Sequence, residues 1–274
     1  MIATLLGLGA GVLVSWMCWS GAAASFRVDA LERTNYRGRP VVTGIGVLIP
    51  VALAIVAAVG RLVVAAGDVI AAWDALTAAT LVAAFGFCLL GLFDDVAGSG
   101  QSGGFSGHLT ALRGGAVTSG MIKLLGGAAV GLLTVSVLQQ DNGTVVGLLR
   151  DGATVALAAN LGNLLDRAPG RSTKFTATIF VVLSVVAWSS WMFAPAVAVG
   201  AGLGLLAPDL KEEAMLGDAG ANVMGAMCGI AALAAFWDSS ERWAVLVALV
   251  ALNVLSEVVS FSKVIDGFGP LRWF

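Results

Sequence analysis

Long apolar runs separated by short polar connections dominate the chain. Each run approaches the roughly 20 residues that a helix needs to cross the hydrocarbon core of a bilayer. The runs do not alternate polar with apolar positions, which excludes the strands of a membrane barrel. We therefore expect an all-α polytopic bundle of nine or ten transmembrane helices, forming one domain over residues 1–274. Nine spans are predicted, at 2–24, 41–65, 71–93, 115–138, 145–165, 172–190, 192–208, 219–237 and 243–265.

The composition agrees with a membrane protein, and the placement of its charges predicts an orientation. The chain is 58% hydrophobic and 12% charged, whereas an ordinary soluble domain is about 25% charged. Cytoplasmic connections of membrane proteins are enriched in Lys and Arg. Most of the cations lie in alternate connections, namely Arg27, Arg33, Arg37, Arg39, Arg113, Arg167, Arg171, Lys174, Lys211, Lys263 and Arg272. We expect a multi-pass protein of the inner (plasma) membrane with its N-terminus outside and its C-terminus in the cytoplasm.

Acidic residues gather on the same predicted cytoplasmic side. Asp94 and Asp95 end the third span, where the helix dipole disfavours negative charge by a few tenths to about 1 kcal/mol each. A neighbouring lysine or a divalent cation is therefore expected to compensate them. Mg²⁺ characteristically uses one or two carboxylates together with substrate phosphates. The same side carries Asp166, Asp209, Glu212, Glu213 and Asp218.

Two charged residues lie deep inside predicted spans. At a rise of 1.5 Å per residue, Lys123 and Glu257 are each about 12 Å from a predicted helix end. A charge at that depth needs a partner, so we expect these two residues to form an ion pair. The alternative for Lys123 is that its ammonium snorkels to the interface.

A polar face ends the fifth span. Asn160, Asn163 and Asp166 recur every third residue, so they lie within about a third of the helix circumference. A hydrogen bond between helices explains one such Asn, but three polar groups leading into the basic turn at Arg167 and Arg171 favour an anionic ligand. For the later segment "MLGDAGANVMGA", helix capping by its Asp and a functional role both remain open.

Taken in order, five segments resemble the polyprenyl-phosphate N-acetylhexosamine-1-phosphate transferases, which include the phospho-N-acetylmuramoyl-pentapeptide transferase. The segments are "YRGRPVVTGIG", "GLFDDVAG", "GMIKLLGG", "NLGNLLDRAPG" and "MLGDAGANVMGA". The resemblance implies transfer of a sugar 1-phosphate from a UDP-sugar to polyprenyl phosphate at the cytoplasmic face, with release of UMP. It also implies a requirement for Mg²⁺ and a place in cell-envelope polysaccharide or peptidoglycan precursor synthesis.

The motifs and the resemblance together predict a site. The expected catalytic residues are Asp94, Asp95, Lys123 and Asp218, with Asp95 and Asp218 as metal ligands. The expected substrate-binding residues are Asn160, Asn163, Asp166, Arg167, Arg171, Arg37, Arg39 and Glu257. The expected partners are the lipid phosphate, the sugar nucleotide and the membrane, with no nucleic-acid polymer. Dimers are common among family members, so a homodimer is an expected assembly.

The chain also departs from the family pattern. Pro169 replaces a second Asp, Met215 lies where an aromatic residue is expected, and the histidine-rich loop is missing, since His108 is the only histidine. These departures leave open a second hypothesis, an inactive relative that acts as a scaffold in cell-envelope assembly. A third hypothesis, an ion-coupled transporter, predicts midplane charges and internal repeats, and the sequence shows neither pattern.

Overall fold

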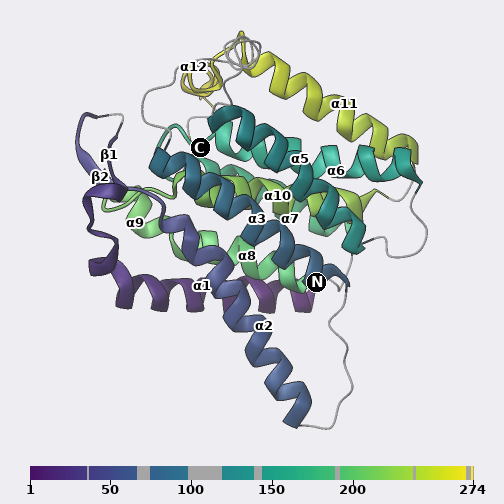
Figure 1. The fold of residues 1–274 in the computed structure, drawn as a ribbon, viewed down its shortest axis with the longest axis horizontal. Helices are drawn as coiled ribbons and strands as arrows, with labels where there is room; N and C mark the ends of the chain where they lie inside the picture. Colours follow the sequence, from purple (N-terminus) through teal and green to yellow (C-terminus); the bar gives the residue numbers. More distant parts are fainter. Residues whose placement is uncertain are drawn as a thin grey trace.

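The computed structural model describes residues 1–35, 37–66, 75–97, 119–138, 144–188, 192–236, 239–269 and 273. Of the residues that the structure describes, 84% are helical, which confirms the predicted all-α bundle (Figure 1). Predictions that fall on Tyr36, His108, Arg113 and Arg272 lie outside the described residues. The helices are α1 (Ile2–Ala22), α2 (Leu48–Ala66), α3 (Ala75–Ala97), α5 (Ser119–Leu138), α6 (Val145–Leu164), α7 (Arg171–Ala187), α8 (Phe193–Gly204), α9 (Leu206–Leu210), α10 (Gly217–Ala235), α11 (Ser239–Ser256) and α12 (Phe261–Gly267).

Each predicted span corresponds to helix, but fewer helices than expected are long and apolar enough to cross a membrane. Within the described ranges there are seven, or eight if α11 and α12 together count as one span. The shortfall from nine or ten has two causes. Helix α7 has only 17 residues, and the last predicted span is broken, with a bend of 93° between α11 and α12.

The break in the last span falls on residues 257–260. Two adjacent β-branched residues, Val258 and Val259, lie in it and lower the local helix propensity. Ser260 then has an extended backbone conformation immediately before α12. Glu257 is therefore not inside a straight helix, as the sequence suggested, but at a corner of the chain.

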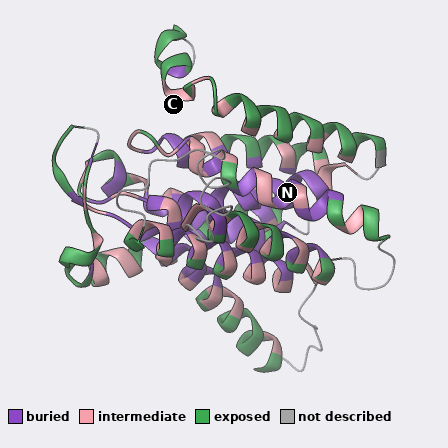
Figure 2. Cartoon of the chain, turned by 45° about the horizontal axis from the view of Figure 1, so that its top comes forward, coloured by how far each residue is buried: buried purple, intermediate pink, exposed green. Residues whose placement is uncertain are grey.

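Helix α10 is the centre of the bundle. It contacts α3, α6, α7 and α8, and most of its residues are buried. By contrast, α11 and the far half of α2 are largely exposed (Figure 2). Small residues allow this packing: a Cβ added at Gly162 of α6 would lie 2.5 Å from the Ala221 carbonyl oxygen of α10. Close backbone contact of this kind drives helix association in lipid, where apolar burial alone gives little advantage. The position of α10 is thus fixed by backbone contacts on several sides.

A short hairpin, which the sequence did not predict, follows α1. Strands β1 (Glu32–Thr34) and β2 (Pro40–Val42) pair antiparallel. Asn35 forms the turn, because its Oδ1 accepts the N–H groups of Arg37 at 2.9 Å and Arg39 at 3.0 Å. The Met215 N–H donates to the Val42 carbonyl at 2.7 Å, which attaches the hairpin to the connection before α10.

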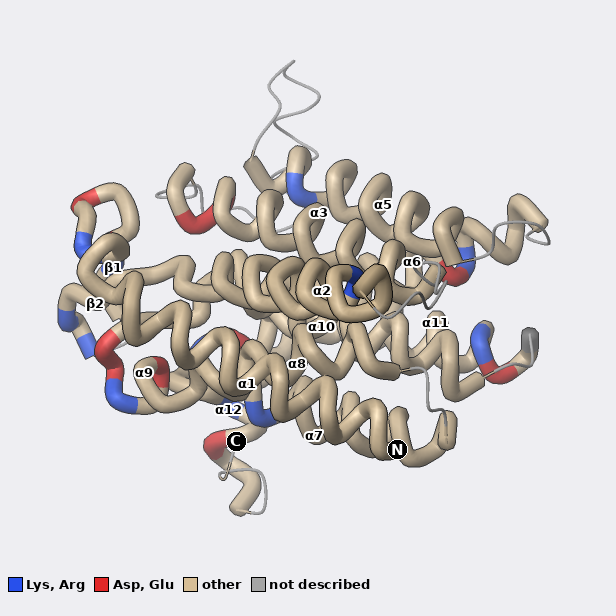
Figure 3. The backbone as a smooth tube through the Cα atoms, turned by 90° about the horizontal axis from the view of Figure 1, so that it is seen from below, with Lys and Arg blue, Asp and Glu red and all other residues tan. Residues whose placement is uncertain are grey.

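Most charged residues lie toward the two ends of the bundle (Figure 3). One end contains the hairpin, the C-terminal end of α3 and the N-terminal ends of α5, α7 and α10. The acids that the sequence placed on one side of the membrane lie together there.

Candidate functional site

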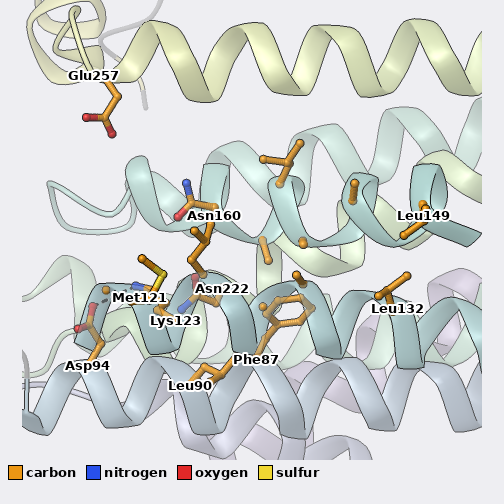
Figure 4. Close-up of a pocket in the computed structure, with 18 residues that line it drawn as sticks. Phe87, Leu90, Asp94, Met121, Lys123, Leu132, Leu149, Asn160, Asn222 and Glu257 are labelled. Carbon is orange, nitrogen blue, oxygen red and sulfur yellow. Dashed lines mark hydrogen bonds and ion pairs between the residues drawn. The ribbon is translucent and has the colours of Figure 1, made fainter. Parts of the chain in front are cut away.

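Lys123 lies at the centre of the polar end of the bundle. Its Nζ donates to Asp94 Oδ2 at 3.1 Å (Figure 4) and also to Asp218 Oδ2. Of the two alternatives that the sequence left open, a lysine does compensate Asp94, whereas Asp95 has no such ion pair within the described residues. The predicted ion pair between Lys123 and Glu257 is wrong, because the ammonium pairs with these two carboxylates instead.

Asp95 has a different role from its neighbour Asp94. Its two carboxylate oxygens accept the backbone N–H groups of Asp218 at 3.1 Å and Ala219 at 3.0 Å. Asp95 thus caps α10 from a neighbouring helix, which satisfies N–H groups that have no partner within α10. Gly217 makes the approach possible: its φ is +71°, and a Cβ there would lie 2.7 Å from Asp95 Oδ2. The consequence is that Asp95 fixes the backbone that carries the Asp218 side chain.

The C-terminal end of α3 is also capped. Arg33, from β1, donates through Nη2 to the Asp95 carbonyl and to the Val96 carbonyl. A cation at a helix C-terminus offsets the negative end of the dipole. This contact explains how α3 can end in two acids.

Two further acids lie beside this group. Asp209 Oδ2 accepts the Gly170 N–H at 2.8 Å, which ties the turn after α6 to α9. Burial raises the pKa of Asp166 well above its usual range, and the charges of Asp209, Asp218 and Asp95 raise that pKa further. We call Asp94, Asp95, Asp166, Asp209 and Asp218 the acid cluster. No motif had singled out Asp209 as a site residue, because its contact with Gly170 joins segments far apart in sequence.

The predicted basic residues are only partly available to a ligand. Arg171 is buried and donates to Ser262 Oγ at 3.0 Å and Asp266 Oδ1 at 2.8 Å, so it attaches α12 to α7. Arg37 pairs with Glu212 at 3.0 Å. The remaining two, Arg39 and Arg167, are exposed at the same end of the bundle.

A pocket of about 620 Å³ opens beside Lys123. Its polar end is formed by Asp94, Lys123, Asn160, Asn222 and Glu257, as Figure 4 shows. From there it continues between α3, α5 and α6 along apolar side chains as far as Leu132 and Leu149. Asn222, which the sequence analysis did not select, enters the pocket because it lies one turn after Asp218 in α10. Asn163 and Asp166 are not among the lining residues.

Carboxylates of the acid cluster are suitable ligands for a divalent cation, but they do not form a complete set of protein ligands. Within the described residues, no three Asp, Glu, His or Cys side chains are arranged to hold a metal ion. Asp94 and Asp218 nevertheless direct carboxylate oxygens at one point, the Lys123 ammonium, and each side chain is about a quarter exposed, at 27% and 26%. Two carboxylates completed by substrate phosphates form a typical Mg²⁺ site. The predicted metal ligand Asp95 is instead engaged with the backbone of α10, and its role as a ligand stays a prediction.

A search against protein-family models and a search of curated proteins each found no match. The family resemblance therefore stays a prediction that depends on the five motifs. Residues from four of those motifs, among them Asp94, Lys123, Asn160 and Asp218, line or contact the pocket described above.

Proposed function

We propose that the protein is a membrane transferase that moves a sugar 1-phosphate from a UDP-sugar to polyprenyl phosphate and releases UMP. One observation carries this proposal: Asp94, Lys123 and Asp218, from three different helices, meet at the polar end of a pocket that is otherwise apolar. The proposed site thus combines groups for phosphate chemistry with a surface for a lipid.

The shape of the pocket matches an amphipathic acceptor. A polyprenyl chain would lie along the apolar part between α5 and α6, where each CH₂ group removed from water contributes about 0.8 kcal/mol. Its phosphate would then reach the Lys123 end. An isoprenoid chain that enters from the bilayer needs an opening to lipid, and the exposed apolar side chains of Leu124 and Leu149 line the pocket on these two helices.

In the proposed reaction an oxygen of the lipid phosphate attacks the sugar-bearing phosphorus of the UDP-sugar. The bond from that phosphorus to the oxygen of UMP breaks, and UMP leaves with the electron pair. Catalysis of such transfers depends mainly on positioning and on neutralisation of charge. Lys123 would neutralise phosphate oxygens, and Asp95 would keep Asp218 in place through the N-terminus of α10. Mg²⁺ bound by Asp218 and Asp94 would supply further charge neutralisation.

We also propose that the end with the acid cluster faces the cytoplasm. The described cations of that end include Arg33, Arg37, Arg39, Arg167 and Lys211, and Lys and Arg favour the cytoplasmic side. Such a rim would attract both anionic substrates.

The test is UMP release by the purified protein with Mg²⁺, undecaprenyl phosphate and a panel of UDP-sugars. We expect release with at least one donor and a loss of about 100-fold or more in Asp218→Asn and in Asp94→Asn. Glu213→Gln is the matched control, because Glu213 is an exposed acid of the same end, and it should keep full activity.

Folded protein that releases no UMP with any donor would contradict the transferase and favour the scaffold hypothesis. Activity that survives in both Asp218→Asn and Asp94→Asn would place the chemistry elsewhere.

A further inference from the structure

The polar end of the pocket contains hydrogen-bonding groups beyond Lys123 and its acids, and their orientation can be worked out. Asn253 of α11 donates through Nδ2 to the carbonyls of Leu157 at 3.2 Å and Leu249 at 2.8 Å. Since carbonyls only accept, the orientation of this amide is fixed. Its Oδ1 accepts the Asn160 Nδ2 at 2.7 Å, so the orientation of Asn160 is fixed as well. Within the described ranges, the groups of Asn160 that remain without a partner are therefore the acceptor Oδ1 and the second N–H of Nδ2.

The same reasoning applies to Asn222. Its Nδ2 donates to the Asp218 carbonyl at 2.7 Å, which leaves Oδ1 as its unpaired acceptor. Glu257 contributes a carboxylate that points into the pocket from the corner between α11 and α12 (Figure 4). In the part of the chain that the structure describes, this carboxylate forms neither an ion pair nor a side-chain hydrogen bond.

Asn160, Asn222 and Glu257 therefore present hydrogen-bond acceptors to the same end of the pocket. A phosphate at this point would face the Glu257 carboxylate and two amide oxygens, so the anionic groups belong at Lys123. A neighbouring ligand group must instead carry hydrogen-bond donors. Sugar hydroxyls and an acetamido N–H are donors of this kind.

We propose that Asn160, Asn222 and Glu257 bind the sugar of the donor and that Glu257 determines specificity. It selects neutral, hydroxyl-rich sugars and rejects sugars that carry a carboxylate, because like charges in a pocket disfavour the wrong partner. The identity of the ligand as a UDP-sugar rests on the proposed function.

The test compares two donors that differ only at carbon 6 of the sugar, UDP-N-acetylglucosamine and UDP-N-acetylglucosaminuronic acid. Their affinities for the full-length protein in detergent are measured by calorimetry, so the readout does not need catalysis. The wild type should prefer the neutral donor by about tenfold or more. Glu257→Gln should reduce that preference to less than about threefold. Glu241→Gln, which removes a carboxylate from the opposite end of α11, should leave it unchanged.

Each outcome decides the inference. Equal affinities in the wild type, binding of neither donor, or an unchanged preference in Glu257→Gln would overturn it. Selective binding without UMP release would support the sugar site and contradict the transferase, so the two proposals fail separately.

Discussion

Two charged networks lie at opposite ends of the bundle, and they are built differently. At the end of the bundle away from Lys123, Asp151 of α6 is fully buried, at 0% exposure. It accepts Arg150 Nε at 2.6 Å and Arg242 Nη1 at 2.7 Å. At the other end Asp94 and Asp218 of the acid cluster pair with Lys123, the one cation ion-paired to that cluster within the described residues. One network has an excess of cations around a buried acid, and the other an excess of acids around a single cation.

The difference separates a structural contact from a binding site. Arg242, from α11, also donates to the Leu233 and Phe236 carbonyls at the end of α10. The network around Asp151, which we call the far network, thus joins α6, α10 and α11. Each carboxylate oxygen of Asp151 is paired with an arginine. The network around Lys123 is partly exposed, opens on a pocket and carries an excess of negative charge. A buried network stabilises the fold, whereas a partly exposed one that opens on a pocket can bind a ligand.

The largest expected effect is on stability and belongs to the far network. Asp151→Asn leaves two cations without their shared carboxylate, and breaking a buried pair costs about 3–5 kcal/mol. Denaturant unfolding in detergent should show this loss, while UMP release per folded molecule should remain close to that of the wild type. If activity fell as much as stability did, the separation between the two ends would be wrong.

The second largest expected effect is on UMP release and comes from a substitution at Lys123 in the pocket. Lys123→Ala removes the cation proposed to neutralise the phosphates, so UMP release should fall by about 10²–10³-fold. Circular dichroism should confirm that the helices remain. Release within threefold of the wild type, an allowance set by about 0.6 kcal/mol, would show that Lys123 serves only to hold the two acids together.

The smallest expected effect is on how the stability of the protein depends on pH, and it belongs to Asp166. Because the pKa of Asp166 is raised in the folded state, the folded state binds the proton more tightly than the unfolded state does. Stability should therefore fall as pH rises from about 4, the usual pKa of Asp, through the raised folded pKa. Asp166→Asn should remove this dependence and unfold at a slightly higher temperature than the wild type at neutral pH. A variant that melts lower at neutral pH would show that the Asp166 carboxylate stabilises the fold.

Much of the architecture could be predicted because its signals are local. The apolar runs predicted the helices, and the basic residues in alternate connections predicted that the acids lie at one end of the bundle. The helix termini at Asp94 and Asp218 also follow from their flanking sequence. These features depend on composition within a window of about 20 residues.

The pairings within the site could not be predicted, because they depend on how helices face one another. Lys123 lies near the start of α5, which begins at Ser119, and the rise per residue does not give its direction around that helix, so its partner was assigned incorrectly. The cap that Asp95 forms on α10 joins residues more than a hundred positions apart, and the left-handed Gly217 that permits it resembles many other glycines in the sequence.

The corner between α11 and α12 is anchored on both sides. Asn253 attaches α11 to α6, while Arg171 attaches α12 to α7 and the Lys174 ammonium binds the Trp273 carbonyl. The four residues 257–260 thus connect two helices that are each attached to the bundle, and Glu257 is the first of the four. Lengthening or shortening that connection by one residue would redirect the Glu257 carboxylate while α11 and α12 stayed attached. A change of length there would therefore alter the polar end of the pocket without disturbing the bundle.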